Sequence, residues 1–331
     1  MQVIQPQALP RFAARRLALG GFAVAALIVS LRLLQPGTIA PVQTFVLIFT
    51  SIVVEAFPFI LLGALVSAVI EVFVPERAFA RLARLPVALQ LPAAAMGGFA
   101  FPVCECGSVP VARRLISRGM HPAAGLAFMF ASPILNPIVL ASTFIAYQGR
   151  GLGWQMVGGR AALGFALALI AGWALGGERA ADLLKPTDEA AAEHVQASSR
   201  RVALIDHLSH DFFFMARFVV IGSALAAALQ TVIPQSIVSA VATTPLVGAL
   251  ALMGIAFVLS LCSEADAFVA VSFTPFPLGS QLAFLVFGPV VDAKLAFLYG
   301  ATFRRRFVMR LIVVSTPVVL AGSLWFEALI R

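Results

Sequence analysis

Long runs of apolar residues, separated by short loops, constrain this chain more than any other feature. They lie at 17–35, 44–74, 87–111, 121–147, 155–176, 210–233, 243–273, 280–303 and 307–329. A helix of about 20 apolar residues is long enough to cross the hydrocarbon core of a bilayer. Only 11% of the residues are charged, against roughly 25% in an ordinary soluble domain. We therefore predict an all-α polytopic membrane protein.

The formal net charge of +8 does not indicate a nucleic-acid partner, because the arginines lie in short loops between apolar runs. This distribution is typical of cytoplasmic anchors beside membrane helices. Arg11, Arg15 and Arg16 precede the run that starts at Leu17, and no convincing small-residue cleavage site follows that run. We expect a retained first helix with a cytoplasmic N-terminus, and a multi-pass location in the cell inner membrane.

The charge pattern also predicts two re-entrant segments. Basic loops stand on both sides of 87–111, so a single crossing there would place three arginines outside. We therefore expect this run to enter and leave from the cytoplasmic side. When the positive-inside rule is applied to the loops of the second half, 243–273 becomes a hairpin that enters from the outside. Arg150 and Arg160 then lie on the outer side and disagree with this rule.

Two halves of the chain resemble each other. Residues 132–136 match 288–292, and Gly63 occupies the place that Gly222 holds in the second half. We predict two inverted repeats, each with three transmembrane helices and a re-entrant or broken helical hairpin, plus one extra N-terminal helix. The alternative is chance similarity between apolar runs. The expected divisions are an N-terminal basic segment with the first helix, repeat 1, a cytoplasmic linker and repeat 2, at 1–43, 44–176, 177–207 and 208–331.

The segment 101–110 contains two thiols and a carboxylate at predicted membrane depth. Its two prolines and one glycine interrupt helical hydrogen bonding. Irregular backbone at that depth survives only when it is buried in protein or lines a cavity. Cys104 and Cys106 can face one soft, thiophilic centre, whereas a lone buried Cys more often acts as a small apolar residue. Glu105 lies between them, and burial would let it carry a proton.

The matching segment of the second half offers Cys262 together with Glu264 and Asp266. If the two hairpin tips meet, Cys262 would complete a three-sulfur site with Cys104 and Cys106, for substrate or for a metal. Glu105, Glu264, Asp266 and Asp292 are the candidates for proton coupling.

Two further positions mark helices that we expect to be broken. Ser132-Pro133 and Asn136-Pro137 should interrupt one helix, and Gly288-Pro289 with Asp292 should interrupt the other. Broken helices free backbone groups that hold ions or polar substrate groups, so Asn136 joins the substrate-binding candidates. The alternative is that these prolines only kink helices for packing. Glu55 and Arg217 also fall within apolar runs, where they could pair.

Motifs for other functions are missing from the sequence. It has no Gly-rich phosphate loop, no zinc-protease histidine pair and no hydrolase nucleophile elbow. We therefore expect neither an enzyme nor a bound cofactor.

Three motifs together resemble the ArsP-type predicted permeases. They are Phe-Pro-x-Cys-x-Cys-Gly-x-x-Pro at 101–110, Ala-Ser-Pro-x-x-Asn-Pro at 131–137 and Cys-Ser-Glu-Ala-Asp-Ala-Phe at 262–268. The resemblance spans about 44–303. Members of that family are associated with efflux of trivalent organoarsenicals such as methylarsenite. It therefore implies a secondary permease of the bacterial inner membrane, with Cys104, Cys106 and Cys262 as arsenic ligands.

Three hypotheses follow. The first is a proton-coupled efflux permease for a small thiophilic substrate, most simply a trivalent organoarsenical. The second is a transporter of soft divalent metal ions. The third is a membrane thiol oxidoreductase, against which stands Cys-x-Cys in place of Cys-x-x-Cys. The expected partners are the substrate and the lipid bilayer, and the sequence is compatible with a homo-oligomer.

Overall fold

A computed structural model describes residues 40–74, 85–100, 103–185, 200–232, 244–304 and 306–330. The first helix expected at 17–35, most of the segment 1–43, and 186–199 of the expected linker lie outside these ranges. So do Phe101 and Pro102 of the first motif. Within the described residues the chain is helical and contains no β-strand, apart from one isolated bridge between Leu184 and Phe303.

The helices follow one another in this order: α2 (Ala40–Phe73), α4 (Val87–Ala100), α5 (Glu105–Ser117), α6 (Pro122–Leu135), α7 (Pro137–Gln148), α8 (Gly153–Leu175), α9 (Ala180–Leu183), α11 (Arg200–Val232), α13 (Pro245–Leu259), α14 (Asp266–Ala270), α15 (Leu278–Phe287), α16 (Ala293–Thr302) and α17 (Arg306–Ile330).

Five helical segments among the described residues are long and apolar enough to cross a membrane. They are Val42–Phe73, Pro122–Gln148, Gly153–Leu175, Arg200–Thr231 and Arg306–Ile330. Large apolar side chains cover the outside of the bundle, with Trp154, Trp173 and Trp325 more than 70% exposed. Such a surface is stable when its solvent is lipid. The prediction of an all-α polytopic membrane protein is confirmed.

Several helices are too short to cross a bilayer alone. With 14 and 13 residues, α4 and α5 are each about 20 Å long, against a hydrocarbon core of about 30 Å. Between them the backbone leaves the helix around Cys104, whose φ of −70° and ψ of 175° are extended. α13 ends likewise at Ser260, whose φ of 47° is left-handed, and an irregular stretch leads to the short α14.

The helix breaks in the structure agree only in part with those predicted from the sequence. α6 ends before Asn136 and α7 begins at Pro137, as expected, and α15 and α16 are separated by 288–292. The expected break at Ser132-Pro133 is wrong, because Pro133 lies inside α6. Pro110 likewise lies inside α5, so the irregular stretch of the first motif is shorter than its prolines suggested. A proline in a helix removes one hydrogen bond, yet both of these residues are buried inside their helices.

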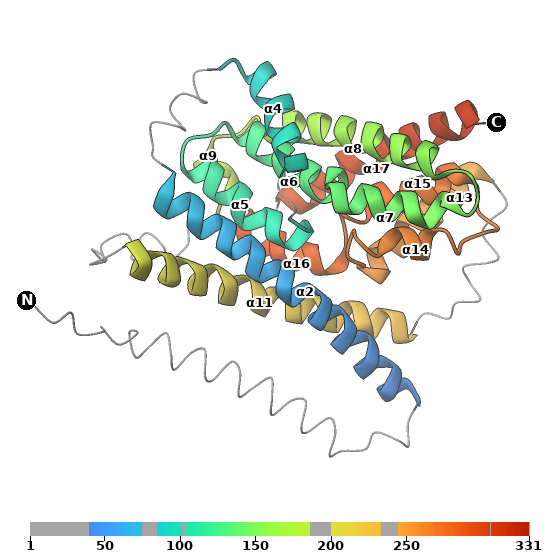
Figure 1. Ribbon diagram of the computed structural model, residues 1–331, viewed down its shortest axis with the longest axis horizontal. Coiled ribbons are helices and arrows are strands. Elements are labelled where there is room, and N and C mark those ends of the chain that lie inside the picture. Colours follow the sequence, from blue (N-terminus) through green and yellow to red (C-terminus); the bar gives the residue numbers. More distant parts are fainter. Residues whose placement is uncertain are drawn as a thin grey trace, which may run out of the picture.

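The long helices enclose the broken ones. α2 packs along α11 on one side, and α8 contacts α17 on the other. α5, α7, α14 and α16 lie between these two pairs (Figure 1). α4 packs on α6 and α8, and in the second half α13 packs on α15 and α17. The main buried core runs through this interior and holds residues from both halves of the chain.

Two glycines let long helices approach the buried interior closely. A Cβ atom on Gly63 of α2 would lie 2.3 Å from the Cα of Gly107 in α5. A Cβ on Gly222 of α11 would lie 2.5 Å from the Cα of Lys294 in α16. Real Cβ atoms do not come so near to backbone, so both contacts require glycine. The two glycines that matched in the sequence therefore fix the distances of α2 and α11 from the centre.

Replacing Gly222 with alanine should push α16 away from α11. Overpacking of this kind costs about 1–3 kcal/mol, and we expect a correspondingly lower thermal midpoint of unfolding in detergent. Gly254→Ala is the matched control, because nothing lies within 4 Å of a Cβ atom at that exposed position of α13. Equal midpoints for the two variants would contradict the close contact at Lys294.

Candidate functional site

The interrupted helices place polar side chains at the centre of the fold. α5 begins at Glu105, and Ser108 Oγ donates to the carbonyl oxygen of Glu105 at 3.0 Å. In the second half, Ser260 Oγ donates to the Phe257 carbonyl at 3.0 Å and accepts from the backbone N–H of Ala293 at 3.1 Å. The end of α13 is thereby fastened to the start of α16.

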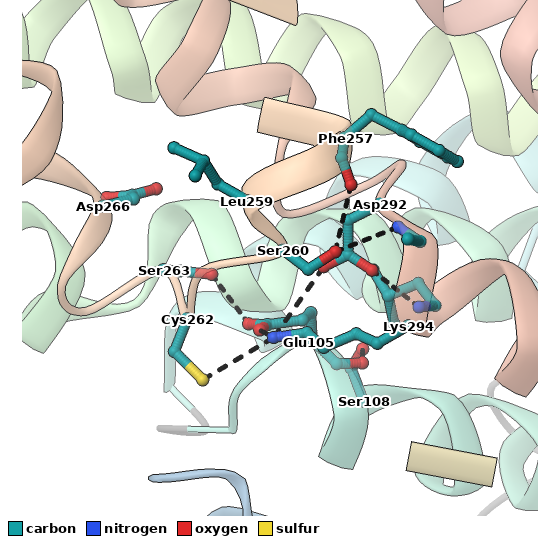
Figure 2. A network of polar contacts seen from close by, with 12 residues as sticks. Glu105, Ser108, Phe257, Leu259, Ser260, Cys262, Ser263, Asp266, Asp292 and Lys294 are labelled. Atoms are coloured by element: carbon teal, nitrogen blue, oxygen red, sulfur yellow. Dashed lines mark hydrogen bonds and ion pairs between the residues drawn. The ribbon is translucent and has the colours of Figure 1, made fainter. Parts of the chain in front are cut away.

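Glu105 is the meeting point of the two halves. Its Oε1 lies 2.8 Å from Nζ of Lys294 on α16, and its Oε2 accepts a 2.8 Å hydrogen bond from Ser263 Oγ (Figure 2). Both partners lie more than 150 residues away in the sequence. Glu105 and Lys294 are shielded from solvent, with side-chain exposures of 0%. A buried charge is tolerated only when it is paired and hydrogen-bonded, which this arrangement provides.

Lys294 also contacts two groups from the second half. Its Nζ lies 3.7 Å from Cys262 Sγ and 3.8 Å from Asp292 Oδ2. Asp292 caps α16, because its Oδ1 accepts from the backbone N–H of Leu295 at 2.6 Å and its own backbone is extended. On a continuous helix, residues two apart would not face each other. The break before α16 is what brings Asp292 and Lys294 together.

A second buried ion pair lies beside the segment between α13 and α14, which carries Cys262. Arg160 of α8 donates to both carboxylate oxygens of Asp266, at 2.8 and 2.7 Å. Its guanidinium also donates to Thr143 Oγ1 at 2.9 Å and to the Ser263 carbonyl at 3.4 Å. Bidentate arginine–carboxylate pairs of this kind are strong and geometrically specific. Ser263 is therefore bonded to both ion pairs, through its hydroxyl on one side and its carbonyl on the other.

The ion pair with Asp266 explains why Arg160 disagreed with the positive-inside rule. The side chain is completely buried and neutralised by Asp266, so it does not act as a charge in a loop. Arg150, by contrast, is exposed and donates to the Val271 carbonyl at 2.7 Å.

The three cysteines are all free and buried. Cys262 joins the charged network through the 3.7 Å contact between its Sγ and Lys294 Nζ, whereas Cys104 and Cys106 are buried at the start of α5. Among the described residues, no group of three or more His, Cys, Asp or Glu side chains is arranged to hold a metal ion. The three-sulfur site stays a prediction.

The remaining candidates have distinct surroundings. Asn136 caps α7, because its Oδ1 accepts from the Ile138 N–H at 2.9 Å, while its buried Nδ2 lacks a hydrogen-bond partner. Both carboxylate oxygens of Glu264 are also buried without a hydrogen-bond partner. Glu264 therefore differs from Glu105 and Asp266, each of which has a basic partner.

The far end of α5 is held by a further cluster of charges. Arg118 and Arg114 both pair with Glu71 of α2, at 2.5 and 3.3 Å, and Arg114 also lies 3.5 Å from Asp211 of α11. Ser67 Oγ donates to Asp211 at 2.7 Å. α5 is thus tied to α2 and α11 at one end and to α16 at the other.

Removing the Ser263 hydroxyl should weaken the central site while preserving the fold. Ser263→Ala leaves one oxygen of the buried Glu105 without its donor, which costs about 1–3 kcal/mol. We expect a lower thermal midpoint and reduced transport. Ser272→Ala is the matched control, since that exposed hydroxyl only donates to the Val269 carbonyl within its own segment. Equal effects of both substitutions would contradict the assigned role of Ser263.

The fold and this site define a multi-pass membrane protein with paired charges and thiols at interrupted helices, the arrangement of a membrane permease. Comparison with known families agrees. The ArsP_1 family, described as a predicted permease, matches residues 42–327, and the chain belongs to this family.

Two curated proteins are similar over most of their length. The UPF0718 protein YcgR of Bacillus subtilis is 42% identical over 281 residues, which cover 84% of this chain and 95% of YcgR. A protein of Streptococcus mutans named as a putative two-component membrane permease complex subunit is 32% identical over 279 residues, or 82% of this chain and 91% of that protein. No solved structure matches the chain.

Sequence reasoning missed three residues of the site. Lys294 was not among the candidates, Arg160 entered only through the positive-inside rule, and Ser263 was only one residue of a motif. For the two basic residues a signal existed. A charge within an apolar run needs a buried partner, and that rule alone would have singled out both.

Proposed function

We propose that this protein is a secondary permease of the bacterial inner membrane that exports a small thiophilic solute. Its proposed cargo is a trivalent organoarsenical such as methylarsenite, and protons drive export. The observation that carries the proposal is the meeting of Glu105 and Lys294, because this ion pair joins the two halves of the chain in the buried interior that also holds the cysteines.

The thiols would bind the cargo, since trivalent arsenic is soft and thiolates prefer soft centres. Cys104, Cys106 and Cys262 are the proposed ligands, with Asn136 as a further polar contact at a helix break. Glu105, Glu264, Asp266 and Asp292 are the proposed proton carriers. Glu264 suits this role well, because its buried oxygens have no hydrogen-bond donor to hold them ionised.

Inverted repeats would let the site open alternately to the two sides of the membrane. α4 packs on α6 and α8 as α13 packs on α15 and α17, and glycines at matching positions set α2 and α11 against the interior. We propose that 44–176 and 208–331 are repeats of opposite orientation with re-entrant hairpins. Rocking of one repeat against the other would expose the site to each side in turn.

Expression in an arsenic-sensitive bacterium tests the cargo. The wild-type chain should raise tolerance to methylarsenite, and a variant with Cys104, Cys106 and Cys262 all replaced by serine should lose that gain at equal membrane abundance. No gain with the wild-type protein present in the membrane would refute this cargo.

A second subunit is a further part of the proposal. The Streptococcus mutans relative is named as one subunit of a two-component membrane permease complex. By analogy we propose that this chain works with a second membrane protein. Purification after crosslinking in its native membrane should recover one stoichiometric partner, and recovery of the chain alone or as a homo-oligomer would exclude it.

A further inference from the structure

A cavity lies where one membrane-spanning helix ends and another begins. It has a volume of about 350 Å³ and is bounded by the last residues of α8, the short α9 and the first residues of α17. Its apolar lining consists of Leu175, Leu183 and Phe307, which are nearly fully buried. One candidate span ends at Leu175 and the other begins at Arg306, so both have their boundary at this cavity. The cavity therefore lies at the level where lipid headgroups meet the protein.

The polar lining of the cavity is more basic than acidic. Three arginines, Arg304, Arg306 and Arg310, face two carboxylates, Glu178 and Asp182. Arg310 pairs with Glu178. Within the described part of the chain, Arg304 and Arg306 form no ion pair, and Arg304 donates to a backbone carbonyl of α9 at 3.2 Å. The lining thus has one positive charge in excess, carried on guanidinium groups, which match the oxygens of a phosphate group.

The arginines of α17 share a helix face with apolar side chains that are open to lipid. Met309 and Val313 are 66% and 64% exposed, and Arg306 and Arg310 are exposed as well. The spacings of three, four and seven residues place all four side chains on one side of the helix. A molecule held by these arginines would therefore have an apolar surface next to its charged group, as a phospholipid requires.

We propose that this cavity binds the phosphate group of an anionic phospholipid, such as phosphatidylglycerol, from the adjoining leaflet. Arg304 and Arg306 hold the phosphate, and the acyl chains lie along Met309 and Val313. Free phosphate shares the charged chemistry, but the exposed apolar side chains beside the arginines favour a lipid. Basic residues at helix ends are common general anchors, whereas a cavity between two helices gives the headgroup one defined place. This lipid site is separate from the proposed transport site.

Lipid binding by the purified full-length protein in detergent, measured by native mass spectrometry, tests this inference. The wild type should bind one phosphatidylglycerol molecule at least about fivefold more tightly than phosphatidylcholine, whose phosphate is balanced by its own cation. Arg306→Gln should weaken phosphatidylglycerol binding about fivefold. Asp182→Asn should tighten it, because this variant removes a negative charge from the cavity lining. Opposite effects of two exposed residues separate recognition of charge from a folding defect.

Arg200→Gln is the matched control. Arg200 is exposed and begins another candidate span, α11, but it does not line the cavity. This variant should bind phosphatidylglycerol as the wild type does. Equal affinities of the wild type for the two lipids would overturn the inference, as would equal losses in Arg200→Gln and Arg306→Gln.

Inorganic phosphate distinguishes the two sources of the charged group. Phosphatidylglycerol should raise the thermal midpoint of unfolding, because a ligand that binds only the folded state stabilises it. Inorganic phosphate should leave the midpoint unchanged, since it makes no contact with the apolar side chains. If inorganic phosphate raised the midpoint as much as phosphatidylglycerol does, the cavity would be a site for free phosphate and the lipid assignment would be wrong.

Discussion

Replacing Glu105 with alanine should abolish transport and lower the free energy of unfolding by about 3–5 kcal/mol, because the buried Lys294 ammonium loses its nearest partner and keeps only the longer contact to Asp292. The measurements are solute tolerance in cells and unfolding in detergent. The matched control is Glu178→Gln, which breaks the exposed ion pair between Glu178 and Arg310. Exposed pairs contribute about 0–1 kcal/mol, so this variant should behave as the wild type.

A double substitution separates stability from function. Glu105→Gln with Lys294→Met removes both charges, and a neutral buried pair of similar volume is often as stable as the ion pair. We expect most of the lost stability to return while transport stays absent. Recovery of transport in the double variant would show that these charges only support the fold.

Breaking the pair between Arg160 and Asp266 should have the second large effect. Arg160→Met leaves Asp266 as an unpaired buried carboxylate and releases the segment after Cys262 from α8, at a cost of about 3–5 kcal/mol. Arg160→Lys should restore little, because an ammonium cannot donate to both oxygens of Asp266 in the planar geometry of a guanidinium.

Arg150→Met is the matched control for this second prediction. Arg150 also donates to the second half, through the Val271 carbonyl at the end of α14, but it is exposed. Its loss should therefore change the unfolding midpoint little. If Arg150→Met and Arg160→Met were equally stable, the buried pair would not anchor the segment 263–266 as the structure indicates.

The sequence predicted those features that follow from local chemistry. Apolar runs indicated the membrane helices, and Asn136-Pro137 and the stretch before Ala293 indicated helix breaks that the structure contains. Proline did not mark a helix break elsewhere, since Pro110 and Pro133 lie buried within helices although each removes one helical hydrogen bond.

Local sequence rules could not predict which ion pairs join the two halves of the chain. Glu105 meets Lys294 at a separation of 189 residues, and Arg160 meets Asp266 at a separation of 106. Only the folded arrangement selects these partners from among the other buried acids. The burial cost of each charge did predict that some partner must exist.

The most direct test of a thiol-and-acid site on a permeation path is transport by the purified chain in proteoliposomes. With an imposed proton gradient, wild-type protein should move methylarsenite across the bilayer. Glu105→Gln and the triple Cys104, Cys106 and Cys262 to serine variant should each reduce the rate to that of protein-free vesicles. Undiminished flux in both variants, in folded protein, would mean that solute crosses the membrane elsewhere.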